Sequence, residues 1–162
     1  MRNMELGGRR LSGMSFGVKW WRRRVMPVGR APVVLDVVES YILDVGAATT
    51  REIADALGLP VKAVSDALRY SHVVRAFRLS FVSGRGRRLG VQRFFGRKHR
   101  YARYVYYVER DALLRWLYTN ACPPRGGRGR FGGWVRAFKH FLRRRGLDDV
   151  EVEFVIRKVK AR

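Results

Sequence analysis

The sequence has few of the features that define several common classes of protein. Its one cysteine, Cys122, excludes an intramolecular disulfide and favours a reducing compartment. One cysteine and three scattered histidines cannot fill a cysteine-type zinc site, so we expect neither a metal nor another cofactor. No apolar run approaches the roughly 20 residues that span a bilayer, and the start of the chain lacks the apolar core of a secretory signal. We therefore expect a cytoplasmic protein with no membrane partner.

Acidic side chains are also scarce. Lys and Arg number 35 against 13 Asp and Glu, which gives a net charge of +22. Such an excess opposes compaction through self-repulsion unless polyanions or counterions screen it. Nucleic acid is the commonest polyanionic partner. The few amides and the richness in Arg, Val and Gly also indicate a thermophile.

The basic residues are concentrated in three stretches. Residues 1–31, 83–103 and 123–145 each carry eight of them and share one acid, whereas the rest of the chain is nearly neutral. The stretches are also rich in glycine, which disfavours rigid structure in isolation. We therefore expect a neutral folded body with three cationic segments: an N-terminal arm (1–31), a long basic loop (83–103) and a C-terminal arm (123–145).

The folded body is predicted to begin with a helix from Pro32 to Val45. Proline suits the first turn of a helix, and Gly46 is a natural end. The apolar residues recur at helical spacing, and we expect them to face the core: Val34, Leu35, Val38, Tyr41, Ile42 and Val45.

Two short helices are predicted next, in the segment TTREIADALGLPVKAVSDALRYSHVV. Thr49 with Glu52 fits a capping box, Gly58 breaks the first helix, and Pro60 opens the second. The positions expected to be buried are Ile53, Ala54 and Leu57 in the first helix, and Val61, Val64, Ala67 and Leu68 in the second.

Residues 73–82 and 103–109 alternate in part and are rich in β-branched and aromatic residues, which predicts two strands. The basic loop 83–103 between them is long enough to need a functional or a disordered explanation. Asp111 is predicted to cap a further helix, DALLRWLYTN. The leucines of that helix either close the core or form a homodimer contact through residues 111–119.

The segment REIADALGLPVKAVSDAL, with a helix before it and strands after it, resembles the winged helix-turn-helix family. The resemblance covers residues 32–119 and implies an α+β fold whose second helix enters the major groove of duplex DNA, with residues 83–103 as the wing. With the apolar stripe turned inward, four residues of the second helix are expected to contact base edges or phosphates: Lys62, Ser65, Asp66 and Arg69. Of these, Asp66 would repel phosphates.

The chain beyond residue 119 is predicted to be a Gly/Arg-rich linker (120–133) followed by an extension (134–162). The extension would contain an amphipathic helix ended by Gly146 and a strand, VEVEFVIRKV. It either packs on the winged domain or forms a small separate unit. The helix residues expected on one side are Trp134, Ala137, Phe138, Phe141 and Leu142.

The basic segments supply most of the candidate phosphate contacts. Aromatic residues lie among the cations of these segments, namely Phe94, Phe95 and Tyr101 in the wing and Trp20 and Trp21 in the N-terminal arm. Two alternatives are open for them: they stack on bases, or they anchor their segments on the fold. The cations are, in the wing, Arg85, Arg87, Arg88, Arg93, Arg97, Lys98, Arg100 and Arg103, and in the arms Arg22, Arg23, Arg24, Arg125, Arg128, Arg130, Arg143, Arg144 and Arg145.

No catalytic constellation is visible, so we expect a binding protein and not an enzyme. The histidines have no nearby carboxylate at a meaningful spacing, and the glycine-rich segments lack the context of a phosphate loop. The helix-turn-helix resemblance favours a DNA-binding transcriptional regulator or chromatin-associated factor on the nucleoid. The alternative is a structural RNA-binding protein of the ribosome or another ribonucleoprotein, which the charge on arms favours.

Overall fold

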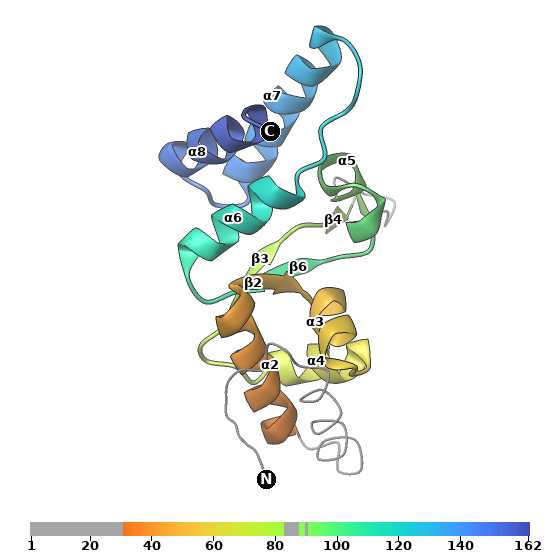
Figure 1. Cartoon of the computed structure of the whole chain (residues 1–162), viewed down its shortest axis with the longest axis vertical. Coiled ribbons are helices and arrows are strands. Elements are labelled where there is room, and N and C mark those ends of the chain that lie inside the picture. Colours follow the sequence, from red (N-terminus) through yellow and green to blue (C-terminus); the bar gives the residue numbers. More distant parts are fainter. Residues whose placement is uncertain (1–30, 83–87, 90) are drawn as a thin grey trace. The chain divides into compact units, whose positions relative to one another are not determined.

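The computed structural model describes residues 31–82, 88, 89 and 91–162. The expected contacts of Arg22, Arg23 and Arg24, of Trp20 and Trp21, and of Arg85 and Arg87 lie outside these residues. The chain has an α+β fold and forms two compact units (Figure 1). Of the described residues, unit 1 contains 31–76 together with Tyr106–Val108, and unit 2 contains the rest.

The described part of unit 1 contains α2 (Ala31–Val45), β2 (Ala47–Thr49), α3 (Thr50–Leu57) and α4 (Val61–Leu68), together with parts of two further strands. Helix α2 lies against α4 and α3, as Figure 1 shows, and the unit's core fills the space between them. The helix expected at 32–45 is confirmed. Val37 joins its buried side, whereas Val45, at the last position, is exposed.

The capping box that the sequence predicts at the start of α3 is confirmed. The Thr49 side chain accepts a hydrogen bond from the Glu52 amide at 3.2 Å, and the Glu52 carboxylate accepts one from the Thr49 amide at 2.9 Å. These bonds satisfy two N–H groups that have no partner within the helix. Gly58 ends α3 in the left-handed conformation, with φ of 67°. The following turn, residues 58–60, leads directly into α4.

Three strands form a small sheet. Strand β6 (Tyr104–Tyr107) lies between β2 and β3 (Arg75–Arg78), and the two units divide within β3 and β6. A second, two-stranded antiparallel sheet pairs β4 (Phe81–Val82) with β5 (Arg88–Leu89), with Phe81 opposite Leu89. The strands expected at 73–82 and 103–109 are present but shorter. Strand β2 was not expected, because its three residues carry no alternating pattern.

Unit 2 is mainly helical. It contains α5 (Val91–Phe95), the 3₁₀ helix η1 (Arg97–His99), α6 (Arg110–Asn120), α7 (Arg128–Arg144) and α8 (Asp149–Lys160). Helix α8 packs against α6 and α7. The basic loop 83–103 is therefore not structureless, because α5 and η1 lie within it.

The prediction of a strand at VEVEFVIRKV is wrong, because this segment is helix α8. Asp148 caps the helix and forms a reciprocal capping box with Glu151. The buried residues follow helical spacing, as Val152, Val155, Ile156 and Val159.

Two expected helix starts also need correction. Helix α7 begins at Arg128, so the second half of the expected linker 120–133 is helical. Helix α6 begins at Arg110, with Glu109 at the N-cap position but without a side-chain capping hydrogen bond, and Asp111 lies in its first turn. The leucines of α6 (Leu113, Leu114 and Leu117) are buried, so this helix uses its apolar face within the chain.

Among residues 31–82 and 91–162, no helix combines the length and apolar character that crossing a membrane requires.

Candidate nucleic-acid interface

Helix α4 presents the first set of candidate residues. Val64, Ala67 and Leu68 are buried in the core of unit 1, so the opposite side of the helix faces water. The side chains of Lys62 and Arg69 are 85% and 76% exposed. The expectation that Val61 is buried is wrong: it is 41% exposed, because it lies at the first helical position, before the stripe meets the core.

Lys62 in α4 and Arg69 at its C-cap both pair with one carboxylate, that of Asp66. Lys62 Nζ lies 2.9 Å from Asp66 Oδ2, and Arg69 Nη1 lies 4.0 Å from Asp66 Oδ1. The hydrogen bond from Lys62, reinforced by the charges of Lys62 and Arg69, lowers the pKa of Asp66. Asp66 is therefore ionised at neutral pH and cancels one of the two positive charges on this face. Ser65 lies beside it, half-buried.

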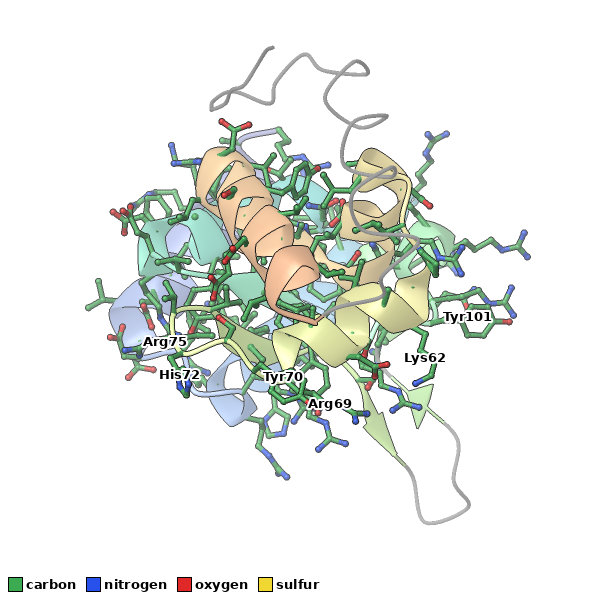
Figure 2. The ribbon with its side chains drawn as sticks, turned by 90° about the horizontal axis from the view of Figure 1, so that it is seen from below. Lys62, Arg69, Tyr70, His72, Arg75 and Tyr101 are labelled. Carbon is green, nitrogen blue, oxygen red and sulfur yellow. The ribbon has the colours of Figure 1, made fainter. Side chains whose placement is uncertain are left out.

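The turn that follows α4 carries functional candidates that sequence reasoning missed. Tyr70 is 62% exposed, and His72 and Arg75 are exposed on the same stretch. Figure 2 shows the labelled side chains of Arg69, Tyr70, His72 and Arg75 following one another along this edge of unit 1. The sequence indicates these candidates in one way, because no acidic residue occurs from Ala67 to Ser80. The prediction of a strand from residue 73 obscured this indication.

Residues 91–103 separate into a buried aromatic side and an exposed cationic side. Val91, Phe94, Phe95 and His99 are buried in unit 2. Tyr101 lies on the exposed side, and the predicted wing cation Arg88 lies in β5. The other predicted wing cations of this stretch are also on the exposed side: Arg93, Arg97, Lys98, Arg100 and Arg103. Sequence adjacency could not resolve which residues belonged to which side.

The predicted base-stacking role of Phe94 and Phe95 is not compatible with their burial. They are 4% and 2% exposed, and their rings meet other aromatic rings of unit 2. The ring centroid of Phe94 lies 4.9 Å from that of Phe141, and the ring centroid of Phe95 lies 5.4 Å from that of Trp116. Phe94 and Phe95 therefore anchor their segment on the fold, which is the second of the two alternatives. Tyr101 differs, because it is 71% exposed with the Arg100 guanidinium 4.8 Å from its ring.

His99 is a structural residue of unit 2. It is buried, its ring lies 5.0 Å from that of Trp116, and its Nε2 lies 3.0 Å from Asn120 Oδ1. Because an amide oxygen only accepts, Nε2 is the protonated nitrogen in this contact. The Asn120 amide in turn donates to the Trp116 carbonyl at 2.9 Å. These contacts orient η1 and its exposed cations on α6.

The C-terminal candidates lie mainly on helix α7. Its buried side is Trp134, Val135, Phe138, Phe141 and Leu142, and Ala137 is half-buried. The exposed side carries Arg136, which sequence reasoning left out. The helix also contains Gly129, Gly132 and Gly133, where an added Cβ would meet no other atom within 4 Å. Of the predicted arm residues, those that are exposed are Arg125, Arg128, Arg130, Arg143 and Arg144.

Two arginines at the end of α7 are engaged within unit 2. Arg143 Nε lies 3.0 Å from Asp149 Oδ1. Arg145 is half-buried, with its guanidinium 5.1 Å from the centre of the Phe141 ring. Burial, followed by the charges of Arg78 and Arg144, lowers the pKa of Arg145. Arg145 is thus partly packed within unit 2, and its role in nucleic-acid binding stays a prediction.

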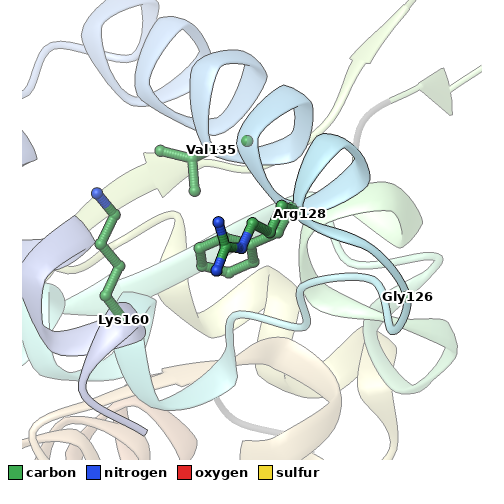
Figure 3. A pocket seen from close by; sticks show the side chains of 6 residues that line it. Gly126, Arg128, Val135 and Lys160 are labelled. Carbon is green, nitrogen blue, oxygen red and sulfur yellow. The ribbon is translucent and has the colours of Figure 1, made fainter.

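An open pocket of about 400 Å³ lies between α7 and α8 (Figure 3). Arg128 and Lys160 approach it from the two helices, and Phe131 and Val135 give it an apolar wall. Lys160 was not anticipated. A cationic rim over an apolar wall can accept an anionic group attached to a planar one.

The described residues contain no group of three or more His, Cys, Asp or Glu side chains that could hold a metal ion. The candidate binding residues are exposed guanidinium and ammonium groups beside two exposed tyrosine rings, those of Tyr70 and Tyr101. Comparison of the chain with protein-family models, with curated proteins and with solved structures found no match.

Proposed function

We propose that the protein binds nucleic acid and has no enzymatic activity of its own. The observation that carries the proposal is the exposed cationic side of residues 91–103 and 121–145. It consists of guanidinium and ammonium groups, and neither stretch contains an acidic residue. Phosphate contacts of this kind give affinity without requiring a catalytic arrangement.

Duplex DNA is the first candidate ligand. The order of α3, a tight turn and α4, followed by strands, supports a winged helix-turn-helix, and the exposed side of α4 would face the major groove. In this case the protein would act as a transcriptional regulator or chromatin-associated factor.

Structured RNA is the second candidate. Two observations favour it: Asp66 neutralises part of the α4 face, and exposed tyrosines lie beside arginines, as a protein that stacks on unpaired bases requires. In this case the protein would be a component of the ribosome or another ribonucleoprotein.

The first test is binding at several salt concentrations, measured by fluorescence anisotropy with duplex DNA and with structured RNA. With six to ten phosphate contacts, affinity should fall by roughly 10³–10⁵ between about 50 and 200 mM salt. Replacing Arg97, Lys98 and Arg100 with glutamine should reduce the salt slope by about one for each phosphate that is no longer neutralised. Binding that does not depend on salt would contradict the proposal.

The matched control replaces Arg51 and Arg115, exposed cations with acidic residues nearby in sequence, with glutamine. This variant should bind as the wild type does. A second variant distinguishes the ligands: alanine at Lys62 and Ser65, which leaves Arg69 in place, should abolish discrimination among DNA sequences if α4 reads DNA. It should leave RNA binding nearly unchanged if RNA is the ligand.

A further inference from the structure

The turn after α4 is fixed by the hydroxyl of Ser71. Ser71 Oγ accepts hydrogen bonds from the amides of Val73 and Val74, at 3.2 and 3.0 Å, and donates one to Glu39 Oε2 on α2. The amide of Tyr70 donates to the Ala67 carbonyl at 3.0 Å, so this residue is tied to the end of α4. The backbone that carries Tyr70 is therefore held at both ends, and little order remains to be imposed on it when a ligand binds.

The ring of Tyr70 lies outside the core of unit 1. It is 62% exposed, while the core between α2, α3 and α4 is closed without it. A single exposed aromatic ring is ordinary. What distinguishes Tyr70 is its surroundings, because Arg69, His72 and Arg75 are all exposed within five residues of it.

Negative charge is scarce along this edge, where the Asp66 carboxylate lies 4.0 Å from Arg69, at the α4 end. The stretch from Ala67 to Ser80 contains no acid. Glu39, which reaches the turn from α2, is hydrogen-bonded to Ser71. An exposed ring with cations on both sides can hold a planar group against its face and the anionic groups that flank it.

A nucleotide combines a planar base with anionic phosphates, and only an unpaired one can use this arrangement. In a duplex the faces of the bases are covered by their neighbours, and a protein reaches only their edges. In a single strand or loop the face of the base is open for stacking.

We propose that Tyr70 is a stacking platform for one unpaired nucleobase, with Arg69, His72 and Arg75 holding the adjacent phosphates. This inference rests on the proposed nucleic-acid binding and adds the form of the ligand, which is a single-stranded segment. A loop in RNA and a single strand of DNA offer the same chemistry.

The test is anisotropy with matched single strands of RNA and of DNA and with the corresponding DNA duplex. Because stacking on one aromatic ring contributes roughly a 5- to 150-fold increase in affinity, Tyr70→Ala should lose that factor for the single strand. Binding of the duplex should change less than twofold. Tyr70→Phe keeps the ring and should bind as the wild type does, whereas Tyr70→Leu keeps only the apolar bulk and should resemble the alanine variant.

A fluorescent base analogue, 2-aminopurine, placed in the strand gives a direct readout. Stacking on Tyr70 should quench it in the wild type and in Tyr70→Phe, and the quenching should be lost in Tyr70→Ala. The control is Leu43→Ala, which removes another exposed apolar side chain of unit 1 and should change neither signal. Tighter binding of the RNA or of the DNA strand by the wild type identifies the source of the unpaired base.

The two proposals fail differently. If the wild type binds no nucleic acid, the proposed function fails and this inference fails with it. If the wild type binds but Tyr70→Ala binds the single strand equally well, or loses single strand and duplex alike, only the stacking platform is overturned. Circular dichroism and thermal unfolding of the alanine, leucine and phenylalanine variants test whether the outcome comes from misfolding.

Discussion

At the scale of single residues, burial divides side chains that the sequence places next to each other. Arg93 and Phe94 are neighbours in the chain, yet Arg93 is exposed and Phe94 is only 4% exposed. A glycine- and arginine-rich stretch with interspersed aromatics is compatible with base stacking or with anchoring. Phe94 is an anchor because its ring packs against Trp134, Phe138 and Phe141 of α7, which lie about 40 or more residues later in the sequence.

We predict that Phe94→Ala destabilises the fold without a specific loss of binding. Removing a buried phenylalanine costs about 3–5 kcal/mol of unfolding free energy, through lost burial and the cavity left behind. Chemical denaturation measures the loss. The control Tyr101→Ala removes an exposed ring and should change stability by less than about 0.5 kcal/mol. A stable Phe94→Ala protein with weakened nucleic-acid binding would contradict this.

A second residue-scale prediction concerns Glu151 of α8. Its carboxylate accepts hydrogen bonds from Arg110 at 2.8 and 3.0 Å and one from the Asp148 amide at 3.1 Å. The side-chain hydrogen bond to Arg110, with smaller help from the Asp148 backbone and the charge of Arg110, lowers the pKa of Glu151 despite partial burial. The folded chain thus favours the ionised form more than the unfolded chain does.

The contribution of the ionised Glu151 is complete above the unfolded-state pKa, about 4.3, and is lost as the pH falls through the lower folded-state pKa. Glu151→Gln should therefore lower the unfolding free energy by about 1.5–3 kcal/mol at pH 7, and the difference from wild type should shrink below about pH 4. Urea denaturation across this range measures it.

Glu153 provides the control on the same helix. It pairs with Lys139 at 3.0 Å but is 54% exposed, so Glu153→Gln should cost at most about 1 kcal/mol. A difference between Glu151→Gln and wild type that stays constant down to about pH 3 would show that the ionised carboxylate is not the source of the stability.

At the scale of elements, helix α7 contains glycines that its own fold does not require. A Cβ at Gly132 or Gly133 would meet no atom within 4 Å. Glycine inside a helix costs up to about 1 kcal/mol relative to alanine, because the unfolded chain has more freedom to lose. We predict that Gly132→Ala and Gly133→Ala each raise the unfolding free energy by up to about 1 kcal/mol, measured by urea denaturation.

Gly146 is the matched control in the same unit. It too has open space around its Cβ position, but its φ is 102°, which side chains rarely adopt. Gly146→Ala should therefore lower stability by roughly 1 kcal/mol. If Gly132→Ala also destabilised the protein, the glycines of α7 would have a role within the fold that open space does not reveal.

Elements with local signals were the ones that could be predicted. The capping box at Thr49, the left-handed Gly58 and the stripe of α4 are set by residues a few positions apart, and the sequence shows them directly. Helix α8 also had a local signal, Asp148 with Glu151, but the alternation in VEVE suggested a strand. Val150, the first residue of that alternation, is 79% exposed, so the pattern did not mark a buried face.

The candidate site was less predictable than the elements, because it depends on contacts between distant residues. The exposure of Lys62 and Arg69 follows from the stripe of α4, but their shared pairing with Asp66 follows from side-chain geometry. Tyr70 was missed because its exposure depends on the way in which Ser71 turns the chain toward Glu39, 32 residues earlier.

At the scale of the whole molecule, charge sets the response to salt. The excess of 22 positive charges produces repulsion that five ion pairs among the described residues offset only in part. Most of these pairs have substantial exposure, and exposed pairs contribute at most about 1 kcal/mol each. Raising the ionic strength from about 0.01 to 0.15 M shortens the Debye length from roughly 30 to 8 Å, which screens the long-range repulsion more strongly than the close contacts.

We therefore predict that the urea midpoint of unfolding rises over this range of sodium chloride without nucleic acid. The variant with glutamine at Arg97, Lys98 and Arg100 carries three fewer charges, so it should start from a higher midpoint and rise less. All three side chains are exposed, and the contact that the Arg100 guanidinium makes with the ring of Tyr101 is itself at the surface, so the core is unchanged. A midpoint that falls with salt would mean that ion pairs outweigh repulsion. The charge excess would then have no destabilising effect for a polyanion to relieve, and nucleic acid should stabilise the fold only through its specific contacts.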